Sequence, residues 1–470
     1  MPEDRRGLDA PPDGAAVPLG TRTQRGASIA RLSATTGAGF LNSRVRRLRE
    51  GEAADARFHA ETAEKMVELL GSMKGAAMKL GQIASFVDMD LPPEVQETYH
   101  EVLAELRAAA PPVDSSAIAL VLTEQFGAPP EQVFASWDPD PLASASIGQV
   151  HRARLPDGSE VVTKVQYPGV AEAVQSDLAN AELFAPLAKV MSPNLQIRPL
   201  MEELRERLVD ELDYQREAQY TQAFFERYDG HPFIRIPRVF PEYCRPRVLT
   251  TAYADGASFD EMLGTATEAQ RQRYGEIIYR FVFGSLNRFR LFNGDPHPGN
   301  YLFPGDGTVV FLDFGSVKTF RSVVRAQIQA QLQAVVAGDV PELLHQLRLA
   351  GFLPAGQRID AGKLMTWFRT LNEPILADRE WTYTPEFARE VNRTTSDPRL
   401  GYFDLLRKLN LPPDYLLLNR IQVGVNSILG SLRARRNWRR ITEEFWRGGE
   451  PATDLGREEA AFIAASPYLA

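Results

Sequence analysis

The sequence has almost no cysteine, since Cys244 is the only one among 470 residues. A single cysteine excludes an internal disulfide framework and a zinc site built from several cysteines. Long apolar runs are also absent. The longest stretch without a charged residue, Ala326–Gly338, is interrupted by glutamines and is shorter than the about 20 apolar residues of a membrane-spanning helix. No uncharged apolar segment follows the first arginines, so no secretory signal is expected.

The chain also lacks an excess of positive charge, because 53 Lys and Arg stand against 61 Asp and Glu, a net charge of −8. No global electrostatic field therefore favours a nucleic-acid partner. The hydrophobic content of 44% and the charged content of 24% are ordinary for a globular protein. At about 150 residues per domain, the length indicates roughly three units. We expect a soluble, cytoplasmic protein.

Composition and periodicity divide the chain. Residues 1–35 are rich in Gly, Pro, Ala and Thr and predict a disordered tail. Residues 36–130 predict a helical extension, because apolar side chains recur every three or four positions from Met66 to Val87. Residues 131–256 predict a small lobe that contains strands. These include Ser144–Arg154 and Glu160–Gln166, which a Pro-Asp-Gly turn joins.

Helical patterns dominate residues 257–445, interrupted by a strand-and-loop segment from Gly294 to Val317. Residues 446–470 are expected to form a loosely ordered C-terminal tail. Strands that precede helices as a block indicate an α+β fold with separate lobes, and not a doubly wound sheet.

Two polar motifs carry the predicted chemistry. Asp295 is followed five positions later by Asn300, and an apolar run then ends in the sequence Asp313-Phe314-Gly315. This order and spacing are typical of the metal and base residues of a kinase catalytic loop. Asp295 can orient an attacking oxygen, while Asn300 and Asp313 supply the oxygen ligands that Mg²⁺ prefers.

A lysine at the end of an apolar strand, Lys164, lies where kinases place the residue that binds phosphate. Such a lysine needs a carboxylate on a helix. Glu211, Asp213 and Glu217 are all available, and Glu211 and Glu217 lie on different faces of a helix because they are six residues apart. Charge alone does not choose between them.

A glycine-rich loop over the phosphates is absent. Its place is taken by a run of small residues that still permit close approach of a backbone, with hydroxyl donors added. The run contains Ala143, Ser144, Ala145 and Ser146.

Four motifs together resemble the UbiB/AarF family of atypical kinase-like proteins. They are Lys79-Leu80-Gly81-Gln82, the Ala-rich loop Ala143–Val150, Glu211-x-Asp213 with Arg216-Glu217-Ala218, and Asp295–Asn300 with Asp313–Gly315. The resemblance covers residues 60–320, more than half of the chain. It implies a bilobal protein-kinase-like fold with an N-terminal helical extension and an enlarged helical C-lobe.

The resemblance also implies site roles, with ATP and Mg²⁺ as cofactors. Lys164 is expected to bind phosphate with Glu217 as its partner, and Asp295 is expected to be the catalytic aspartate. The hinge that follows Leu249 is expected to contact nucleotide. The remaining expected site residues are Thr251 and Tyr253 for nucleotide, Asn300 and Asp313 for metal, and Lys79, Gln82, Glu211 and Asp213 for an extension that folds over the site. Val162 departs from the alanine that is usual two positions before the lysine.

The resulting hypothesis is a Mg-dependent atypical kinase or ATPase that acts in or supports quinone or other isoprenoid-lipid metabolism. Its partners would be ATP, an isoprenoid lipid or quinone precursor, and a membrane surface contacted peripherally. One alternative is a nucleotide-binding pseudokinase scaffold. Another is a small-molecule kinase similar to aminoglycoside phosphotransferases, which share a pattern much like Asn293–Asn300, with an aspartate and, five positions later, an asparagine.

Overall fold

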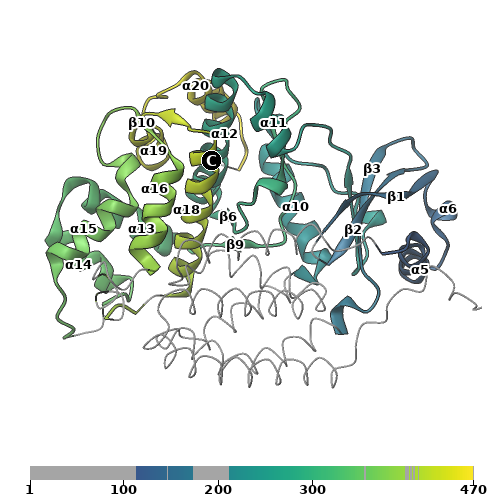
Figure 1. Cartoon of the computed structure of the whole chain (residues 1–470), viewed down its shortest axis with the longest axis horizontal. Helices are drawn as coiled ribbons and strands as arrows, with labels where there is room; N and C mark the ends of the chain where they lie inside the picture. The colour runs from purple at the N-terminus through teal and green to yellow at the C-terminus, as the bar shows by residue number, and fades with distance from the viewer. Residues whose placement is uncertain are drawn as a thin grey trace, which may run out of the picture.

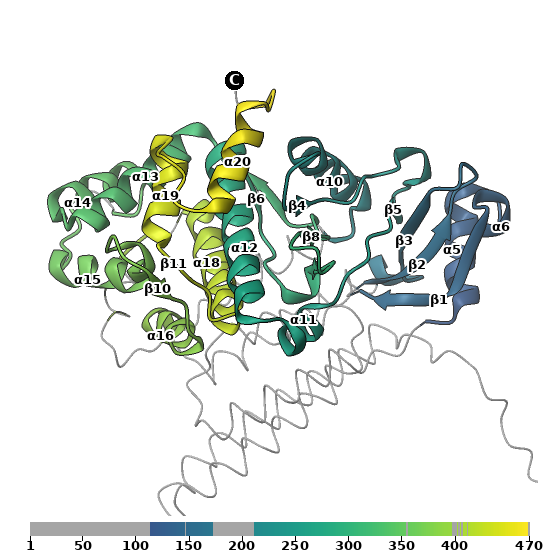
Figure 2. The ribbon, with the colours of Figure 1, turned by 90° about the horizontal axis from the view of Figure 1, so that it is seen from above.

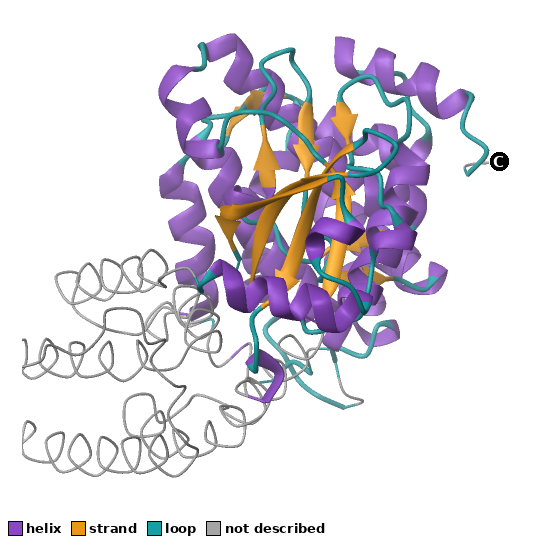
Figure 3. Cartoon of the chain, turned by 90° about the vertical axis from the view of Figure 1, so that its right-hand side faces the viewer, coloured by secondary structure: helices purple, strands orange, loops and turns teal. Residues whose placement is uncertain are grey.

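The computed structural model describes residues 113–145, 147–172, 211–353, 356–396, 402, 405, 408–410 and 412–468. The tail expected over residues 1–35, most of the extension expected over 36–130, Lys79, Gln82 and Ser146 lie outside the described residues. Two lobes lie side by side in the described part, a small one built on strands and a large one built mostly on helices (Figure 1). Seen from the side of the small lobe, its strands lie in front of the helices of the large lobe (Figure 3).

The small lobe is built on an antiparallel sheet in the order β1-β2-β3-β5. Its strands are β1 (Ser136–Ser144), β2 (Gly148–Arg154), β3 (Glu160–Gln166) and β5 (Val248–Ala252). The pair β2–β3 confirms the predicted hairpin, but β1 was not predicted, because two prolines interrupt its pattern. An edge strand tolerates proline, and the register of β1 with β2 shifts on both sides of Pro141.

Helices cover this sheet. Helix α5 (Ser115–Phe126) begins at Asp114, whose side chain accepts a hydrogen bond from the Ser116 amide. Apolar side chains of α5 pack against β3 and β5, and the short helix α6 (Pro130–Val133) follows it. Although α5 falls within the range expected for the extension, it packs on the sheet of the small lobe. Helix α10 (Tyr214–Tyr228) contacts β5 and β4 (Ile234–Arg235).

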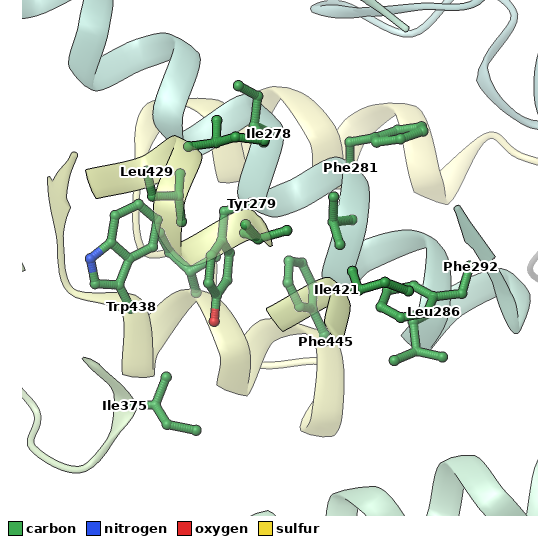
Figure 4. Packing of buried hydrophobic residues seen from close by; sticks show 14 of the residues in the cluster. Ile278, Tyr279, Phe281, Leu286, Phe292, Ile375, Ile421, Leu429, Trp438 and Phe445 are labelled. Carbon is green, nitrogen blue, oxygen red and sulfur yellow. The ribbon is translucent and has the colours of Figure 1, made fainter. Parts of the chain in front are cut away.

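The large lobe is built around helix α12, whose residues from Tyr274 to Leu286 are almost all buried. Its helices are α11 (Phe259–Thr265), α12 (Glu268–Phe289), α13 (Ser322–Ala337), α14 (Val340–Leu349), α15 (Ala361–Leu371), α16 (Pro385–Ser396), α18 (Pro413–Ser431), α19 (Trp438–Arg447) and α20 (Asp454–Ala464). Figure 4 shows the packing of this core, with Trp438 of α19 beside Tyr279 of α12, their ring centroids 4.7 Å apart. A helix that is apolar on most of its surface is buried in this way.

Short strands position the loops between the lobes. They are β4, which pairs in parallel with β8 (Val309–Phe311), then β7 (Tyr301–Leu302) on the other side of β8, and the separate pair of β6 (Leu291–Asn293) with β9 (Val317–Thr319). This confirms the strand-and-loop character predicted for the segment. A further short pair, β10 (Trp381–Thr382) with β11 (Arg435–Arg436), interrupts the helices that follow.

The expectation of a loosely ordered C-terminus is wrong. Helix α20 packs beside α12 (Figure 2), and both Leu455 and Glu459 of α20 are buried. Electrostatic contacts hold this helix in place, because Glu459 bonds to Arg280 and Arg288 of α12. The periodicity of the sequence does not reveal such pairs, so the prediction missed them. Within the described ranges, none of the helices is long and apolar enough to cross a membrane.

Candidate active site

Lys164 lies at the centre of the candidate site. It stands on β3 between Val150 of β2 and Leu249 of β5. Its Nζ donates hydrogen bonds to both carboxylate oxygens of Glu217, at 2.8 and 3.0 Å, and lies 3.6 Å from Oδ2 of Asp313. Because alternate residues of a strand share one face, Lys164 and Val162 lie on the same face of the sheet. The structure therefore joins β3, α10 and the Asp313 segment through one ammonium group.

Burial and charge act in opposite directions on this pair. Burial disfavours the charged ammonium, but Glu217 and Asp313 outweigh it and hold the pKa of Lys164 well above its ordinary value. Burial raises the pKa of Glu217 to about 7, and the nearby Lys164 limits that rise. The Glu217 side chain is only 3% exposed. The lysine is thus a fixed positive charge between Glu217 of α10 and Asp313.

Charge alone left the carboxylate partner of Lys164 open, and the family resemblance implied Glu217. Glu217 is the one that bonds to Lys164. Asp213 instead caps helix α10, because its side chain accepts a hydrogen bond from the Arg216 amide at 3.0 Å. Glu211 lies at the start of the described segment. The expected contacts of Glu211 and Asp213 with the extension involve residues outside the described ranges and stay predictions.

The side chains of two asparagines hold the Asp295 loop in place. Asn300 Nδ2 donates to the carbonyl of Asp295 at 3.1 Å and to its Oδ2 at 3.4 Å. Asn293, which the sequence reasoning did not assign a role, accepts a hydrogen bond from the Asp295 amide and donates one to the Asp313 carbonyl, at 2.7 Å. One asparagine side chain therefore ties the Asp295 loop to the Asp313 segment.

The Asp313 segment is anchored on both sides. Asp313 Oδ1 accepts a hydrogen bond from the Gly315 amide at 2.9 Å, and the preceding strand β8 is fully buried, as predicted. Phe314 is completely buried, and its ring centroid lies 4.7 Å from that of Phe224 on α10. Because Phe224 and Glu217 belong to the same helix, this aromatic contact fixes the helix that positions Lys164. From the sequence, Phe224 could be recognised only as an apolar residue, so its contact with Phe314 could not be predicted.

The Ala-rich loop forms the turn between β1 and β2. Ala143 and Ser144 pair with β2, and the Ala145 amide donates to the Gly148 carbonyl at 2.8 Å. At Gly148 a side chain is excluded, because a Cβ there would lie 2.3 Å from the Val165 carbonyl oxygen. Gly148 thus lets the hairpin pack directly against the strand that carries Lys164.

The predicted hinge residues lie at the end of β5. Thr251 pairs with Val162, and the Tyr253 amide donates to the Glu160 carbonyl at 3.0 Å. The guanidinium of Arg152 lies 3.9 Å from the centroid of the Tyr253 ring. Since Arg152 is opposite Val162 in the β2–β3 register, it lies on the same face of the sheet as Lys164. The alternation of β2 was the signal that could have found it.

The residues present fit a hard divalent cation. Asp313 offers carboxylate oxygens, and Asn300, whose Nδ2 is engaged with Asp295, offers its amide oxygen. Within the described ranges, no group of three or more His, Cys, Asp or Glu is arranged to hold a metal alone. This is expected for Mg²⁺, which proteins usually bind through one or two carboxylates together with substrate phosphates.

Helix α18 approaches the Asp295 loop closely. A Cβ on Gly424 would lie 2.7 Å from Pro296 Cγ. We expect Gly424→Ala to displace the loop and to lower the free energy of unfolding by about 1–3 kcal/mol, as measured by guanidinium denaturation. Gly264→Ala on α11 is the matched control, because a Cβ there has no neighbour within 4 Å. Equal effects of the two substitutions would show that the contact with Pro296 is not tight.

Comparisons with known proteins agree with this geometry. The family model described as "ABC1 atypical kinase-like domain" matches residues 105–347. The chain is 33% identical over 293 residues to "Atypical kinase COQ8B, mitochondrial" of Rattus norvegicus. The aligned region covers 62% of this chain and 54% of that protein. It is 28% identical over 407 residues to "AarF domain-containing protein kinase 1" of Xenopus tropicalis, which covers 81% and 73%.

A solved structure is also similar, "The complex structure of Rv3197-erythromycin from Mycobacterium tuberculosis". The sequence identity is 30% and the TM-score is 0.60, over 84% of this chain and 97% of the other. Such a score over nearly the whole of the other chain means that the two share an overall fold. The chain spans about half the length of the first curated relatives that it matches.

Proposed function

We propose, because this chain belongs to the UbiB/AarF family of atypical kinase-like proteins, that it binds ATP with Mg²⁺ and catalyses transfer or hydrolysis of the terminal phosphoryl group. The observation that carries the proposal is the position of Lys164 Nζ, 2.8 Å from Glu217 and 3.6 Å from Asp313. A lysine held in this way between a helix carboxylate and a metal-binding aspartate is what phosphoryl transfer requires.

Each residue of the site has a role in this proposal. Lys164 would bind the phosphates, and Glu217 would hold it in place. Asp313 and Asn300 would hold Mg²⁺, which neutralises charge on the phosphates when bound. Asp295 would orient the attacking hydroxyl or water and accept its proton. Thr251 and Tyr253 would contact the nucleotide base, and Ala143, Ser144, Ala145 and Ser146 of the Ala-rich segment would also bind the nucleotide.

Family membership supports a proposal for the class of acceptor. We propose an isoprenoid lipid or a quinone precursor as the molecule that the protein phosphorylates or helps to process. A cytoplasmic location with peripheral contact to a membrane surface would suit such a substrate. Membership of this family favours these acceptors over the hydroxyl groups of an aminoglycoside-like alcohol. Lys79 and Gln82 would regulate access to the site from the extension, through Glu211 and Asp213.

Mg-dependent stabilisation by ATP tests the proposal. A ligand at 100 times its Kd stabilises the folded state by about 2.7 kcal/mol, so MgATP should raise the thermal midpoint of the full chain. We expect Asp313→Asn to abolish this rise, because it removes a carboxylate ligand of the metal. Asp306→Asn is the matched control, since Asp306 pairs with Arg235 on the surface, and it should keep the full rise.

An unchanged MgATP shift in Asp313→Asn would refute the metal assignment. ATP turnover should then be measured on the same preparations, with and without lipid vesicles. Stabilisation by MgATP without any turnover would support the alternative of a nucleotide-binding pseudokinase scaffold.

A further inference from the structure

The large lobe contains a cavity of about 200 Å³ that is separate from the candidate active site. Its walls come from helices α12, α13, α15, α18 and α19 and from the segment that follows α15. Among its lining residues, Tyr279, Leu286 and Ile375 are labelled in Figure 4. Lys164, Asp295 and Asp313 do not line it. A ligand of this cavity would therefore contact none of these three residues.

The chemistry of the cavity is apolar and uncharged. No Asp, Glu, Lys, Arg or His is among the residues that line the cavity, which are mostly aromatic and aliphatic. A charged ligand would lose its hydration there without gaining a partner. An engineered apolar cavity of about 150 Å³ holds benzene, so this larger cavity matches one substituted aromatic ring.

Two hydrogen-bond donors of the wall are left without acceptors. Asn426 Nδ2 on α18 and Trp367 Nε1 on α15 are buried, and the described residues offer neither of them a partner. Other polar side chains of the wall are satisfied, since Gln422 donates to the Leu371 carbonyl and Gln331 to the Tyr415 hydroxyl. Buried donors are nearly always paired in folded proteins, so these two indicate that an acceptor from outside the chain belongs in the cavity.

We propose that this cavity is a binding site for a small, uncharged aromatic molecule that carries a hydrogen-bond-accepting oxygen, such as an aryl ketone. The ring would fill the apolar volume, and the oxygen would accept a hydrogen bond from Asn426 Nδ2. Binding at this site needs neither nucleotide nor Mg²⁺, so its test does not depend on the proposed phosphoryl transfer.

Isothermal titration of the full chain without nucleotide tests the proposal, with acetophenone and α-methylstyrene as probes. The two molecules have nearly the same shape, but the second has a methylene group where the first has its carbonyl oxygen. We expect acetophenone to bind saturably at one site per chain, at least fivefold more tightly than the hydrocarbon. Absence of binding, or equal binding of the two probes, would overturn the proposal.

Two variants locate the site. Asn426→Leu keeps the size of the side chain but removes the donor, so the preference for acetophenone should fall at least threefold while the hydrocarbon still binds. Leu371→Phe adds a ring to the wall of the cavity and should weaken both probes at least tenfold. If Leu371→Phe fails to fold, Asn426→Leu decides alone. An unaltered preference in Asn426→Leu, or ordered water on both donors in a crystal soaked with acetophenone, would refute the assignment.

Discussion

Replacing Lys164 with methionine is expected to lower the rate of ATP turnover by about 10²–10³-fold at saturating MgATP. Loss of one preorganised group that stabilises transition-state charge has effects of this size. Lys164 Nζ lies 5.0 Å from the centroid of the Tyr214 ring. Methionine has a similar length and no charge, so the packing of β3 against this ring should persist. Turnover is measured by phosphate release from the full chain.

The substitution also leaves Glu217 without its cation, and this second effect has to be separated from the first. A buried carboxylate without a partner has a raised pKa and stays neutral. Because its folded state then binds more protons than its unfolded state, the variant loses stability as the pH rises above the ordinary value of 4.5. In the wild type the pKa of Glu217 is about 7, so the difference in stability between the two proteins should grow above about pH 7. We therefore expect Lys164→Met to be closer to wild type in stability at pH 5 than at pH 8.

The double variant Lys164→Met/Glu217→Gln separates these effects. The glutamine cannot ionise, so the stability of the double variant should lose this pH dependence, yet its turnover should stay as low as that of Lys164→Met. Recovery of turnover together with stability would show that Lys164 acts only through packing and not on the phosphates.

The sequence predicted the parts of this site that depend on local order. Asp295, Asn300 and Asp313 follow a fixed spacing, and Lys164 ends an apolar strand, so each could be named without coordinates. The bilobal kinase-like fold, which the family resemblance implied, is confirmed. Spacing and charge did not identify the lysine's partner among Glu211, Asp213 and Glu217. The resemblance implied Glu217, and the structure pairs Lys164 with Glu217, whereas Glu211 precedes α10.

Contacts between residues far apart in the chain could not be predicted from the sequence. Phe224 meets Phe314 from 90 positions away, and Gly424 meets Pro296 from a helix that follows much later. Edge strand β1 was missed because its prolines resemble a turn, although an edge position leaves their missing N–H groups without cost. The C-terminus was misjudged because the partners of Glu459, which are Arg280 and Arg288 of α12, lie more than 170 positions earlier in the sequence.

The partner of that C-terminal helix is Arg280, and Arg280→Met is expected to lower the free energy of unfolding by about 3–5 kcal/mol. Arg280 is completely buried. Its guanidinium donates to Glu276, Glu444 and Glu459, each at 2.8 Å, and to Thr453 at 3.0 Å. Removing one partner of a buried ion network leaves uncompensated charges, which is much more costly than losing a surface pair. Guanidinium denaturation at pH 7 measures the loss.

Two controls distinguish the causes. Arg280→Lys keeps the charge but not the forked geometry that reaches three carboxylates at once, so its loss should be intermediate. Arg440→Met removes an arginine that pairs with Asp378 on the surface, where both side chains are about half exposed, and it should change the stability little. If Arg280→Met were no more destabilising than Arg440→Met, the buried network would not hold the C-terminal helix in place.

The pH dependence of Arg280→Met gives the sharpest test. Although burial alone would raise it, His231, Arg288 and Arg280 hold the pKa of Glu459 at about 2 in the folded chain, against an ordinary value of 4.5. A carboxyl with a lowered pKa stabilises the folded state above its unfolded value and loses that contribution as the pH falls. In Arg280→Met the stabilisation from ionised Glu459 is smaller, because one of the cations that lower its pKa is missing.

The difference in stability between wild type and Arg280→Met should therefore be largest near pH 7 and shrink as the pH falls from about 4.5 toward 2. A difference that stays constant over this range would mean that Arg280 stabilises the lobe by packing alone.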